Sequence, residues 1–571
     1  MPPKLTIPAP RARRSAQRNG GAPSQAPASA AAGDVGEGPG GERRARRSRG
    51  AAGALSAPAP ARSRKTENKI QPIRELSRVL AREKNRGKTV VLCHGVFDLV
   101  HLGHIRHLEA AKREGDVLVV TITPDEHVNK GPGHPVFNQR LRAETLAALQ
   151  NVDFVAVNEW PTSIETIRLL RPDVYVKGSE YAQADGDLTG AIRDEEQAVL
   201  SVGGRIHFTD EITFSSSHLL NAHFNRFPPE TEDFLAEFRR TYRGTEVIDH
   251  LRQLADLNVL VLGDSIIDEY HFCRPYGMAS KSSAIAAQFV SSEAYAGGAL
   301  AVANHLAGFC RRVNLVTCLG EQDSRQEFIA RHLKPNVSAK FFFRPDTSTV
   351  VKRRYVHGFL VTKLFEVSFF NGQPLPASVN EMLHGYLANV IEEYDLVVVA
   401  DFGHGMIGGN VIDLLCQRAR YLAVNAQLNS MNFGYNVVAK YPRTDYVCID
   451  EEEARMSSRD RYGALEPLVE RLAETLRCRM ITVTRGYHGS VTYQPDRGLV
   501  KVPVLAREVV DTIGAGDAYL AVTAPCACKG FPAELIGFIG NAVGALAVRF
   551  IGNKESIEPV PLFKFITALL K

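Results

Sequence analysis

The sequence of 571 residues lacks several features that would point to common classes of protein. It has no run of 18 apolar residues, so a membrane-spanning helix is not expected. Its nine cysteines are scattered, and the closest pair, Cys526 and Cys528, has neither zinc-ligand nor CxxC redox spacing. Because nothing suggests a disulfide framework, a reducing cytoplasm is the expected compartment.

Basic charge is concentrated near the N-terminus. Residues 1–68 contain 13 Lys and Arg against 4 Asp and Glu, a net charge of +9, whereas the remainder has 55 against 59, a net charge of −4. This segment, rich in Ala, Pro, Gly and Arg, cannot bury enough apolar area to offset its chain entropy, so we predict a disordered tail. A solvated extension, a tether to an anionic partner and a transit peptide stay open, and the acidic remainder gives no reason to expect a specific nucleic-acid partner.

Alternating strand and helix patterns run from Lys69 to about Asn225. Short apolar runs such as "KTVVLCHG", "DVLVVTIT", "DFVAVNE" and "DVYVKG" are typical of buried parallel strands. Amphipathic segments such as "HIRHLEAAKREG", "NQRLRAETLAALQNV" and "SIETIRLLRP" lie between them. This alternation predicts a doubly wound parallel sheet over residues 69–225.

A second α/β series follows a charged helical connector, which we expect at residues 226–257. The strands expected in residues 258–571 include "NVLVLGDS", "DLVVVADFG", "YLAVNA", "DYVCID" and "MITVTRG". The expected fold class is therefore α/β, with two doubly wound domains after a disordered tail.

The stretch "GVFDLVHLGH", residues 95–104, places His101 and His104 three residues apart where a strand turns into a helix. Ligands of doubly wound sheets bind beyond the carboxyl ends of the strands, and free N–H groups at a helix start favour phosphate. Two imidazoles on one helix face could stabilise the charge that develops on a phosphate under attack. Zinc is an alternative if His94 or Asp98 completes a ligand set, although no HExxH motif occurs, and a structural pair is another.

The stretch "CHGVFDLVHLGHIRHL" resembles the HxGH motif of the nucleotidyltransferase superfamily, in its cytidylyltransferase-like branch. The similarity is greatest to the nucleotidyltransferase half of the bifunctional ADP-heptose synthases. It continues through "VFNQRLRAETLAAL", "RPDVYVKGSEY" and "TFSSSHLLN", over residues 88–222. It implies a Rossmann-like fold and attack by a sugar or polyol phosphate on the α-phosphorus of a nucleoside triphosphate, with pyrophosphate leaving.

This resemblance implies roles for particular residues. His101 and His104 would stabilise the transferred nucleotidyl phosphate. The implied nucleotide-binding residues are Gly95, Phe97, Asp98, Arg140, Lys177, Ser215, Ser216 and Ser217. The serine segment offers His218 where the family continues to a basic residue, so ATP and CTP both stay open as the nucleotide.

The stretch "DTIGAGDA", residues 511–518, is the candidate for a second site. A P-loop kinase is not indicated, because GxxxxGK[ST] is absent. The segment from Gly514 through Ala515 to Gly516 has no bulky side chain, so its backbone N–H groups can form an anion site ahead of a helix. Asp517 could accept a proton from an attacking hydroxyl. Taken alone, this stretch is equally consistent with an ordinary glycine-rich turn.

The motifs "VLVLGDSIIDEY", "YAGGALAVANHLAGF", "VVVADFGHGM", "DEEE", "VTRGYHGS" and "DTIGAGDAY", in this order, resemble the ribokinase/PfkB family of sugar kinases over residues 258–560. The resemblance implies a ribokinase-like fold that uses ATP and Mg²⁺. Asp517 would be the general base, and Gly514, Ala515 and Gly516 the anion hole. The other implied residues are Thr484 and Gly486 for ATP, Asp264, Asp268, Gly297, Gly298 and Asn304 for the sugar, and Asp450 and Glu453 for the metal.

Two positions depart from the family pattern. Asp450 replaces the asparagine of NxxE, which suggests tuning rather than loss, and Ala301 and Val302 stand where a sugar-contacting asparagine is usual. Lys352 and Arg354 are candidate contacts to an anionic substrate, with solvated surface charge as the alternative.

A kinase and a nucleotidyltransferase on one chain suggest consecutive steps. We expect a bifunctional nucleotide-sugar synthase of the ADP-heptose type, acting on a heptose 7-phosphate-like sugar and then on the sugar 1-phosphate, with the two domains in reversed order. The alternatives are a sugar kinase coupled to a cytidylyltransferase that makes a CDP-polyol or CDP-sugar, and a binding or regulatory module that has lost one activity. The expected partners are a sugar phosphate and a nucleoside triphosphate, and self-association stays open.

Overall fold

The computed structural model describes residues 68–128, 135–178, 191–209, 227–358, 362–429, 432 and 434–571. The tail predicted for residues 1–68 lies outside these ranges, apart from Asn68. Two bodies, each built on its own parallel sheet, are described separately below.

The first body contains five parallel strands in the order β3-β2-β1-β4-β5. The strand order reverses between β1 and β4, and in such sheets ligands bind beyond the carboxyl ends of the strands at that point. The strands are β1 (Val90–Gly95), β2 (Val117–Ile122), β3 (Phe154–Val157), β4 (Val174–Gly178) and β5 (Arg205–Thr209).

Helices cover both faces of this five-stranded sheet. One core contains Leu108 of α3 and Leu146 of α4, and the other contains Leu80 of α2 and Ile167 of α5. Because both faces are buried, the strands are apolar runs without alternation, and the predicted doubly wound arrangement is confirmed. The helices are α2 (Ile73–Asn85), α3 (Leu102–Arg113), α4 (Gln139–Ala147), α5 (Ile164–Leu170) and α6 (Ala191–Ser201).

The second body is built on a nine-stranded sheet in the order β10-β9-β6-β13-β14-β15-β16-β17-β18. Its pairs are parallel from β10 to β16, and β17 and β18 extend it as antiparallel strands. The strands are β6 (Asn258–Gly263), β9 (Arg312–Gly320), β10 (Val337–Arg344), β13 (Leu396–Asp401), β14 (Leu422–Ala426), β15 (Tyr446–Asp450), β16 (Met480–Thr484), β17 (Ser490–Gln494) and β18 (Gly498–Val502).

Two hydrophobic cores lie on the two faces of the nine-stranded sheet. One includes Leu300 of α10, Leu520 of α16 and Phe538 of α17, and the other includes Leu383 of α12 and Leu472 of α15. No helix within the described ranges is long and apolar enough to cross a bilayer. The helices are α10 (Ala299–Leu306), α11 (Gln326–His332), α12 (Ala377–Val390), α13 (Gly409–Arg418), α14 (Glu451–Ser458), α15 (Leu465–Thr475), α16 (Ala515–Cys528), α17 (Ala533–Ala547) and α18 (Pro559–Leu570).

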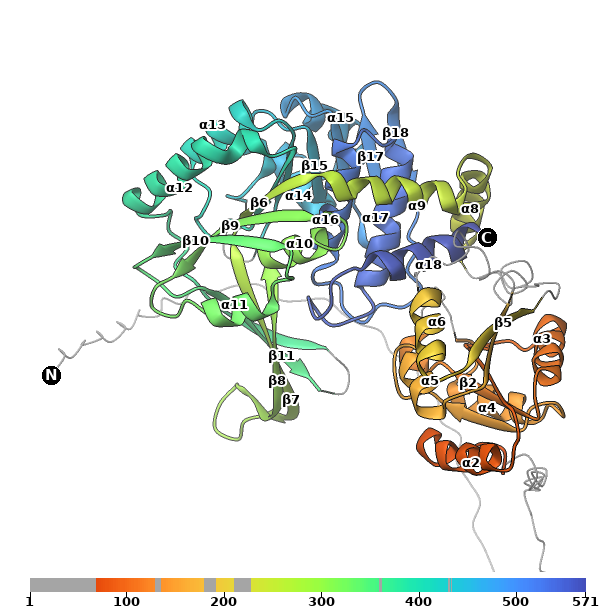
Figure 1. Ribbon diagram of the computed structural model, residues 1–571. Coiled ribbons are helices and arrows are strands. Elements are labelled where there is room, and N and C mark those ends of the chain that lie inside the picture. Colours follow the sequence, from red (N-terminus) through yellow and green to blue (C-terminus); the bar gives the residue numbers. More distant parts are fainter. Residues whose placement is uncertain are drawn as a thin grey trace, which may run out of the picture. The chain divides into compact units, whose positions relative to one another are not determined.

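A four-stranded sheet in the order β12-β11-β7-β8 belongs to the second body and was not anticipated from the sequence. In Figure 1 it extends away from the nine-stranded sheet. Only Asp264 separates β6 from β7, so "VLVLGDSIIDEY" reads as one strand although the chain changes sheets within it. The strands are β7 (Ser265–Met278), β8 (Ile285–Gly298), β11 (Val350–His357) and β12 (Lys363–Phe369).

The expected connector forms helices α8 (Pro229–Thr241) and α9 (Gly244–Arg252), which join the core of the second body. Phe238 of α8 stacks on Phe538 with ring centroids 4.2 Å apart. The guanidinium of Arg239 donates to the carbonyl of Leu569 at 2.8 Å. These helices therefore do more than link two domains, because they complete one of them.

Candidate active sites

The two histidines of the first motif lie between β1 and α3, at the carboxyl edge of the five-stranded sheet. His101 caps α3, because its Nδ1 accepts a hydrogen bond from the N–H of Gly103 at 3.1 Å. Nδ1 of His104 accepts from the N–H of His101 at 3.4 Å, and the two ring centroids are 4.1 Å apart. Since each ring uses Nδ1 as an acceptor, each neutral ring carries its hydrogen on Nε2 and can donate it to an anion at the helix start.

The turn before these histidines is strained. Phe97 has a φ of 47°, in the left-handed region that costs a bulky residue about 1–3 kcal/mol. Its ring packs edge-on against His104, with centroids 5.4 Å apart, and a side chain at Gly95 would press on the same ring. The buried carboxylate of Asp98 accepts from the N–H of Phe137 at 3.0 Å. Packing around Phe97 thus fixes the orientation of His104.

Lys177 is a cation that acts on two other histidines of this body, His94 and His107. It lies at the end of β4, where its ammonium pairs with Glu195 of α6 at 2.9 Å. Burial, and then the charge of Lys177, lower the pKa of His94 to about 3 and the pKa of His107 to about 4. Each of these rings also shares a hydrogen bond with a threonine hydroxyl. His94 and His107 are therefore neutral rings that fit a structural role.

The zinc alternative finds no support within the described ranges. No three His, Cys, Asp or Glu side chains there are grouped to hold a metal ion. One oxygen of Asp98, a candidate ligand, already accepts from the backbone of Phe137.

The structure brings only some of the predicted nucleotide-binding residues together. Arg140 is solvent-exposed on α4, and its Nε lies 3.1 Å from Glu144. Arg142 of the same helix is buried instead. Sequence reasoning missed this arginine, which donates to the carbonyl of Val96, within the motif, at 2.6 Å. The segment 215–217 lies outside the described residues.

An open cleft of about 560 Å³ marks the second site. It lies where the nine-stranded sheet, the four-stranded sheet and the start of α16 meet. The predicted residues on its walls are Asp268, Gly298, Asp450, Glu453, Thr484, Gly486, Gly514, Ala515, Gly516 and Asp517.

Asp517 is buried in the first turn of α16, directly after the glycine turn. Burial, and then the nearby Asp268, raise the pKa of its carboxyl to about 7. Gln427, which follows β14 and was not anticipated, donates from Nε2 to Oδ1 of Asp517 at 2.8 Å and lowers the pKa in part. A carboxyl that titrates near pH 7 and is oriented by a neutral donor suits a general base.

Asp268 lies across the cleft on β7. Its carboxylate is 2.5 Å from Nη1 of Arg354 and accepts from Nδ2 of Asn553 at 3.0 Å. Any side chain at Gly297 would clash with this carboxylate, so glycine is required there for close approach. The carboxylate oxygens of Asp268 can accept hydrogen bonds from hydroxyl groups of a ligand in the cleft.

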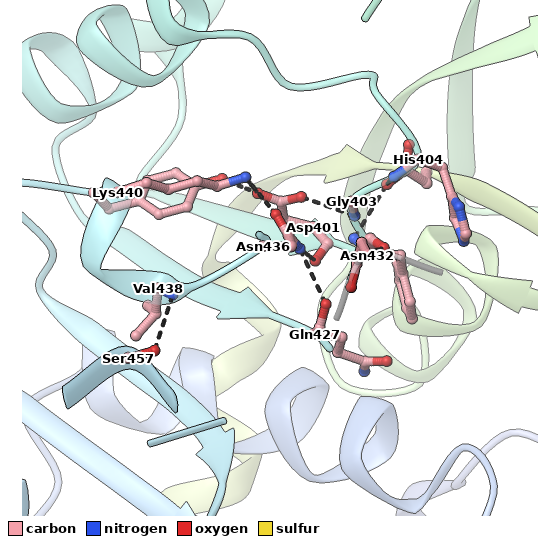
Figure 2. Close-up of polar contacts among 12 residues, drawn as sticks. Asp401, Gly403, His404, Gln427, Asn432, Asn436, Val438, Lys440 and Ser457 are labelled. Atoms are coloured by element: carbon pink, nitrogen blue, oxygen red, sulfur yellow. Dashed lines mark hydrogen bonds and ion pairs between the residues drawn. The ribbon is translucent and has the colours of Figure 1, made fainter. Parts of the chain in front are cut away.

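Asp264, predicted to bind the sugar, is not on the walls of the cleft and borders a small separate pocket. Its Oδ2 accepts from the N–H groups of Phe402 and His404, and burial together with the charge of Asp401 raises its pKa to about 7. Asp401 is in turn bound by Lys440, at 2.5 Å. Figure 2 shows this polar network around Asp401, with the imidazole of His404 directed away from it.

The turn before Gly514 is tied to the four-stranded sheet through Asp511. One oxygen of this buried carboxylate is 2.6 Å from the ammonium of Lys363 on β12, and the other accepts from the hydroxyl of Tyr270 on β7 at 3.0 Å. Burial would raise the pKa of Asp511, but the hydrogen bond from Lys363 holds it below its usual value. Gly514 has a φ of 82°, and a side chain there would clash with Asn553.

Asp450 and Glu453 form a reciprocal cap at the start of α14. Oδ1 of Asp450 accepts from the N–H of Glu453 at 2.7 Å, and the Glu453 carboxylate accepts from the N–H of Asp450 at 2.8 Å. Burial and the charge of Asp450 raise the pKa of Glu453 to about 8. A divalent cation would relieve this repulsion, and Mg²⁺ commonly uses one or two carboxylates together with water and substrate phosphates. The donor set therefore fits Mg²⁺ carried by a nucleotide.

Asn304 is not on the walls of the cleft. Its amide donates to the carbonyl of His332 and accepts from the N–H of Lys334, so it joins α10 to the end of α11.

Two regions of the chain match known protein families. Residues 256–559, more than half of the chain, match the model of the pfkB family carbohydrate kinases. The chain belongs to the pfkB family. The pfkB region contains the whole 560 Å³ cleft, and residues 92–221 match the cytidylyltransferase-like family, so both resemblances inferred from motifs are confirmed.

Curated relatives match about a quarter of the chain. The "Bifunctional protein HldE" of Syntrophotalea carbinolica is 40% identical over 146 residues, which is 25% of this chain and 28% of that protein. The protein of the same name from Gluconobacter oxydans is 38% identical over 150 residues, 26% of this chain and 30% of that protein. The chain thus spans less than a third of the length of these relatives.

Solved structures similar to this chain include a phosphofructokinase and a ribokinase. Phosphofructokinase-2 from Escherichia coli has a TM-score of 0.44 and 11% identity, covering 55% of this chain and 100% of its own. Ribokinase from Thermotoga maritima has a TM-score of 0.43 and 18% identity, covering 54% of this chain and 99% of its own.

Proposed function

We propose that the chain is a bifunctional enzyme that phosphorylates a sugar phosphate with ATP and joins a nucleotide to a sugar 1-phosphate, as in ADP-heptose synthesis. The observation that carries the kinase half is Asp517, a buried carboxyl with a pKa of about 7 that faces the cleft beside the Gly514 turn. The kinase substrate is a heptose 7-phosphate or a close analogue, and the bifunctional HldE relatives support this pairing of activities.

In the kinase step, a substrate hydroxyl oxygen attacks the γ-phosphorus of ATP. The new O–P bond forms as the bond to the β,γ-bridging oxygen breaks, and ADP leaves. Asp517 takes the hydroxyl proton, while Asp268 orients the neighbouring hydroxyls. Backbone N–H groups from Gly514 to Gly516 stabilise the charge on the transferred group. Asp450 and Glu453 would hold Mg²⁺, which neutralises phosphate charge when bound with ATP.

In the nucleotidyl-transfer step, a phosphate oxygen of the sugar 1-phosphate attacks the α-phosphorus of the nucleoside triphosphate. Pyrophosphate leaves, and no covalent intermediate with the protein is needed. His101 and His104 donate from Nε2 to the α-phosphate oxygens, and the N-terminus of α3 adds its partial positive charge. Lys177 is the expected contact to the outer phosphates, and Asp98, whose carboxylate accepts from the N–H of Phe137, is expected to shape the nucleotide pocket.

The test uses the purified full-length chain in two assays. With ATP and D-glycero-D-manno-heptose 7-phosphate, we expect a heptose bisphosphate and ADP by mass spectrometry. With heptose 1-phosphate and either ATP or CTP, we expect pyrophosphate and ADP-heptose from ATP. Pyrophosphate formed only from CTP would contradict the ADP-heptose assignment and indicate a CDP-sugar synthase. This is the second candidate function, which the match to the cytidylyltransferase-like family supports.

A further inference from the structure

Asn553 lies on the wall of the 560 Å³ cleft, although it belongs to none of the sequence motifs. It is part of the loop between α17 and α18. Its Nδ2 donates to Oδ2 of Asp268 at 3.0 Å, across 285 positions of the chain. The other oxygen of Asp268, Oδ1, is 2.5 Å from Nη1 of Arg354. Each oxygen of this carboxylate therefore meets a donor from a different element, and the two donors together fix its orientation.

The same amide lies against the glycine turn that begins α16. A side chain at Gly514 would collide with Oδ1 of Asn553, and a side chain at Gly297 on β8 would come within 3.3 Å of its Nδ2. Two glycines from distant parts of the chain thus make room for one amide. Asn553 fills the space where β7, β8 and the turn before α16 meet.

The loop that carries Asn553 is held on both sides of this residue. The N–H of Gly552 donates to Oδ2 of Asp511 at 3.1 Å, and the N–H of Ile557 donates to Nδ1 of His305 at 2.9 Å. A side chain on an anchored backbone can hold another group in place, because it has little freedom to follow that group when it moves. Asn553 is therefore placed to keep two parts of the cleft in register.

A neutral donor suits this position. The charge of Asp268 contributes to the raised pKa of Asp517, so a cation at position 553 would weaken that influence and make Asp517 a weaker base. The guanidinium of Arg354 already supplies the positive partner of Asp268. An amide holds the carboxylate in place and leaves the net charge of the cleft unchanged.

We propose that Asn553 is a positioning residue of the kinase site, which holds the carboxylate of Asp268 at a fixed place relative to the phosphate-binding turn at Gly514. This inference rests on the proposed kinase function, in which Asp268 orients the sugar and the turn stabilises the transferred group. Phosphoryl transfer requires the attacking oxygen to be aligned with the γ-phosphorus, to within about 0.5 Å. The amide joins the two elements on which that alignment depends.

The test measures phosphorylation of D-glycero-D-manno-heptose 7-phosphate by ATP in the full-length chain. Asn553→Ala should lower kcat by roughly 10- to 100-fold, the usual cost of a small misalignment. KM for ATP should stay near the wild-type value, because Asp511 still holds the glycine turn. In a chain that already carries Asp268→Ala, adding Asn553→Ala should lower kcat by less than about twofold, since the group that Asn553 positions is gone.

Asn410→Ala is the matched control, because Asn410 is an exposed asparagine at the start of α13 whose Oδ1 accepts from Nδ2 of Asn380 at 3.1 Å. It should leave kcat and KM unchanged. Asn553→Asp keeps the shape but sets a second carboxylate against Asp268, so it should lower kcat at least as much as Asn553→Ala. Full activity in Asn553→Asp, or the same loss from Asn553→Ala with and without Asp268, would overturn the inference.

Urea unfolding separates this result from failure of the proposed function, because it needs no substrate. The wild type, the two single variants Asn553→Ala and Asp268→Ala, and the double variant form a cycle in which the shifts of the urea midpoint should be less than additive. That result in a protein without kinase activity would keep the positioning of Asp268 and remove the kinase assignment. The same result with a wild-type kcat in Asn553→Ala would overturn the inference, since the contact would then stabilise the fold alone.

Discussion

The two candidate sites of this chain would handle phosphate with opposite arrangements of side chains at the start of a helix. At the first, His101 and His104 present neutral donors at the start of α3, directly after a strained turn. At the second, the start of α16 presents backbone N–H groups, and the side chain beside them is the buried acceptor Asp517. Both exploit the positive end of a helix.

The difference follows from the chemistry that each site would perform. A phosphate that attacks the α-phosphorus has already lost its proton, so the first site needs donors and no base. A hydroxyl that attacks the γ-phosphorus must lose a proton, so the second site needs a carboxylate whose pKa lies near neutrality. The pKa of about 7 for Asp517 meets that need.

Replacing Asp517, the proposed general base, should have the largest effect of the changes considered, and it should affect only the second site. Asp517→Asn should reduce ATP-dependent sugar phosphorylation by about 10³-fold or more, because general-base catalysis and proton acceptance are both lost. Pyrophosphate release in the nucleotidyl-transfer assay should persist. Asp496→Asn, at an exposed turn, is the control. Loss of both activities in a folded variant would contradict two independent sites.

The reciprocal change should break the first site alone. His104→Ala should reduce nucleotidyl transfer by about 10²- to 10³-fold, the usual cost of removing one donor to a developing charge. Kinase turnover should stay at the wild-type level, and so should both activities in the control His384→Ala on α12. Unchanged pyrophosphate release in His104→Ala would remove the histidine pair from the mechanism.

The pH dependence of the kinase step sharpens the comparison. Only the carboxylate form of Asp517 accepts a proton, so kcat/KM should fall as the pH drops through about 7. In Gln427→Leu, the lost donor no longer stabilises the carboxylate, so the pKa rises and this limb moves to higher pH. Measuring kcat/KM from pH 5.5 to 9 in the wild type and in Gln427→Leu checks both expectations. If the fall in kcat/KM occurs at the same pH in the two proteins, Gln427 does not influence the pKa of Asp517.

The smallest effect should come from the tie between the four-stranded sheet and the glycine turn. Lys363→Met leaves the buried Asp511 without its cation, which should loosen the segment before Gly514 and lower kinase kcat by about tenfold. Added methylammonium should restore part of the rate by filling the vacated position. Lys501→Met, which breaks the exposed pair with Glu466, should change neither quantity. A rate that Lys363→Met leaves intact would show that Asp511 needs no cation.

The fold class could be predicted from the sequence because both parallel sheets are buried on two faces. Apolar runs such as "VLVV" are typical of strands buried in this way. The sequence also allowed Asp517 and the histidine pair to be proposed as site residues, because each of these motifs is a run of residues adjacent in the chain. The four-stranded sheet could not be predicted because β7 continues β6 with one residue between them, and the end of β7, from Arg274 to Met278, is largely exposed.

Contacts between residues far apart in the chain could not be predicted from the sequence. Gln427 meets Asp517 across 90 positions and Lys363 meets Asp511 across 148, and no local pattern marks either pair. Arg140 and Arg142 illustrate the same limit within one helix, since their burial depends on which face of α4 meets the sheet. The roles predicted for Arg140, for Asn304 and for residues 215–217 stay predictions.

The stacking of Phe238 on Phe538 decides where this chain can be divided. A fragment that starts at Asn258 would lose α8 and α9 and leave an apolar strip of the kinase core open to water, inviting aggregation. A fragment that starts at Phe227 keeps the strip covered. Any attempt to produce the kinase separately, or to graft it onto another partner, should therefore treat these two helices as its first elements and not as a spacer.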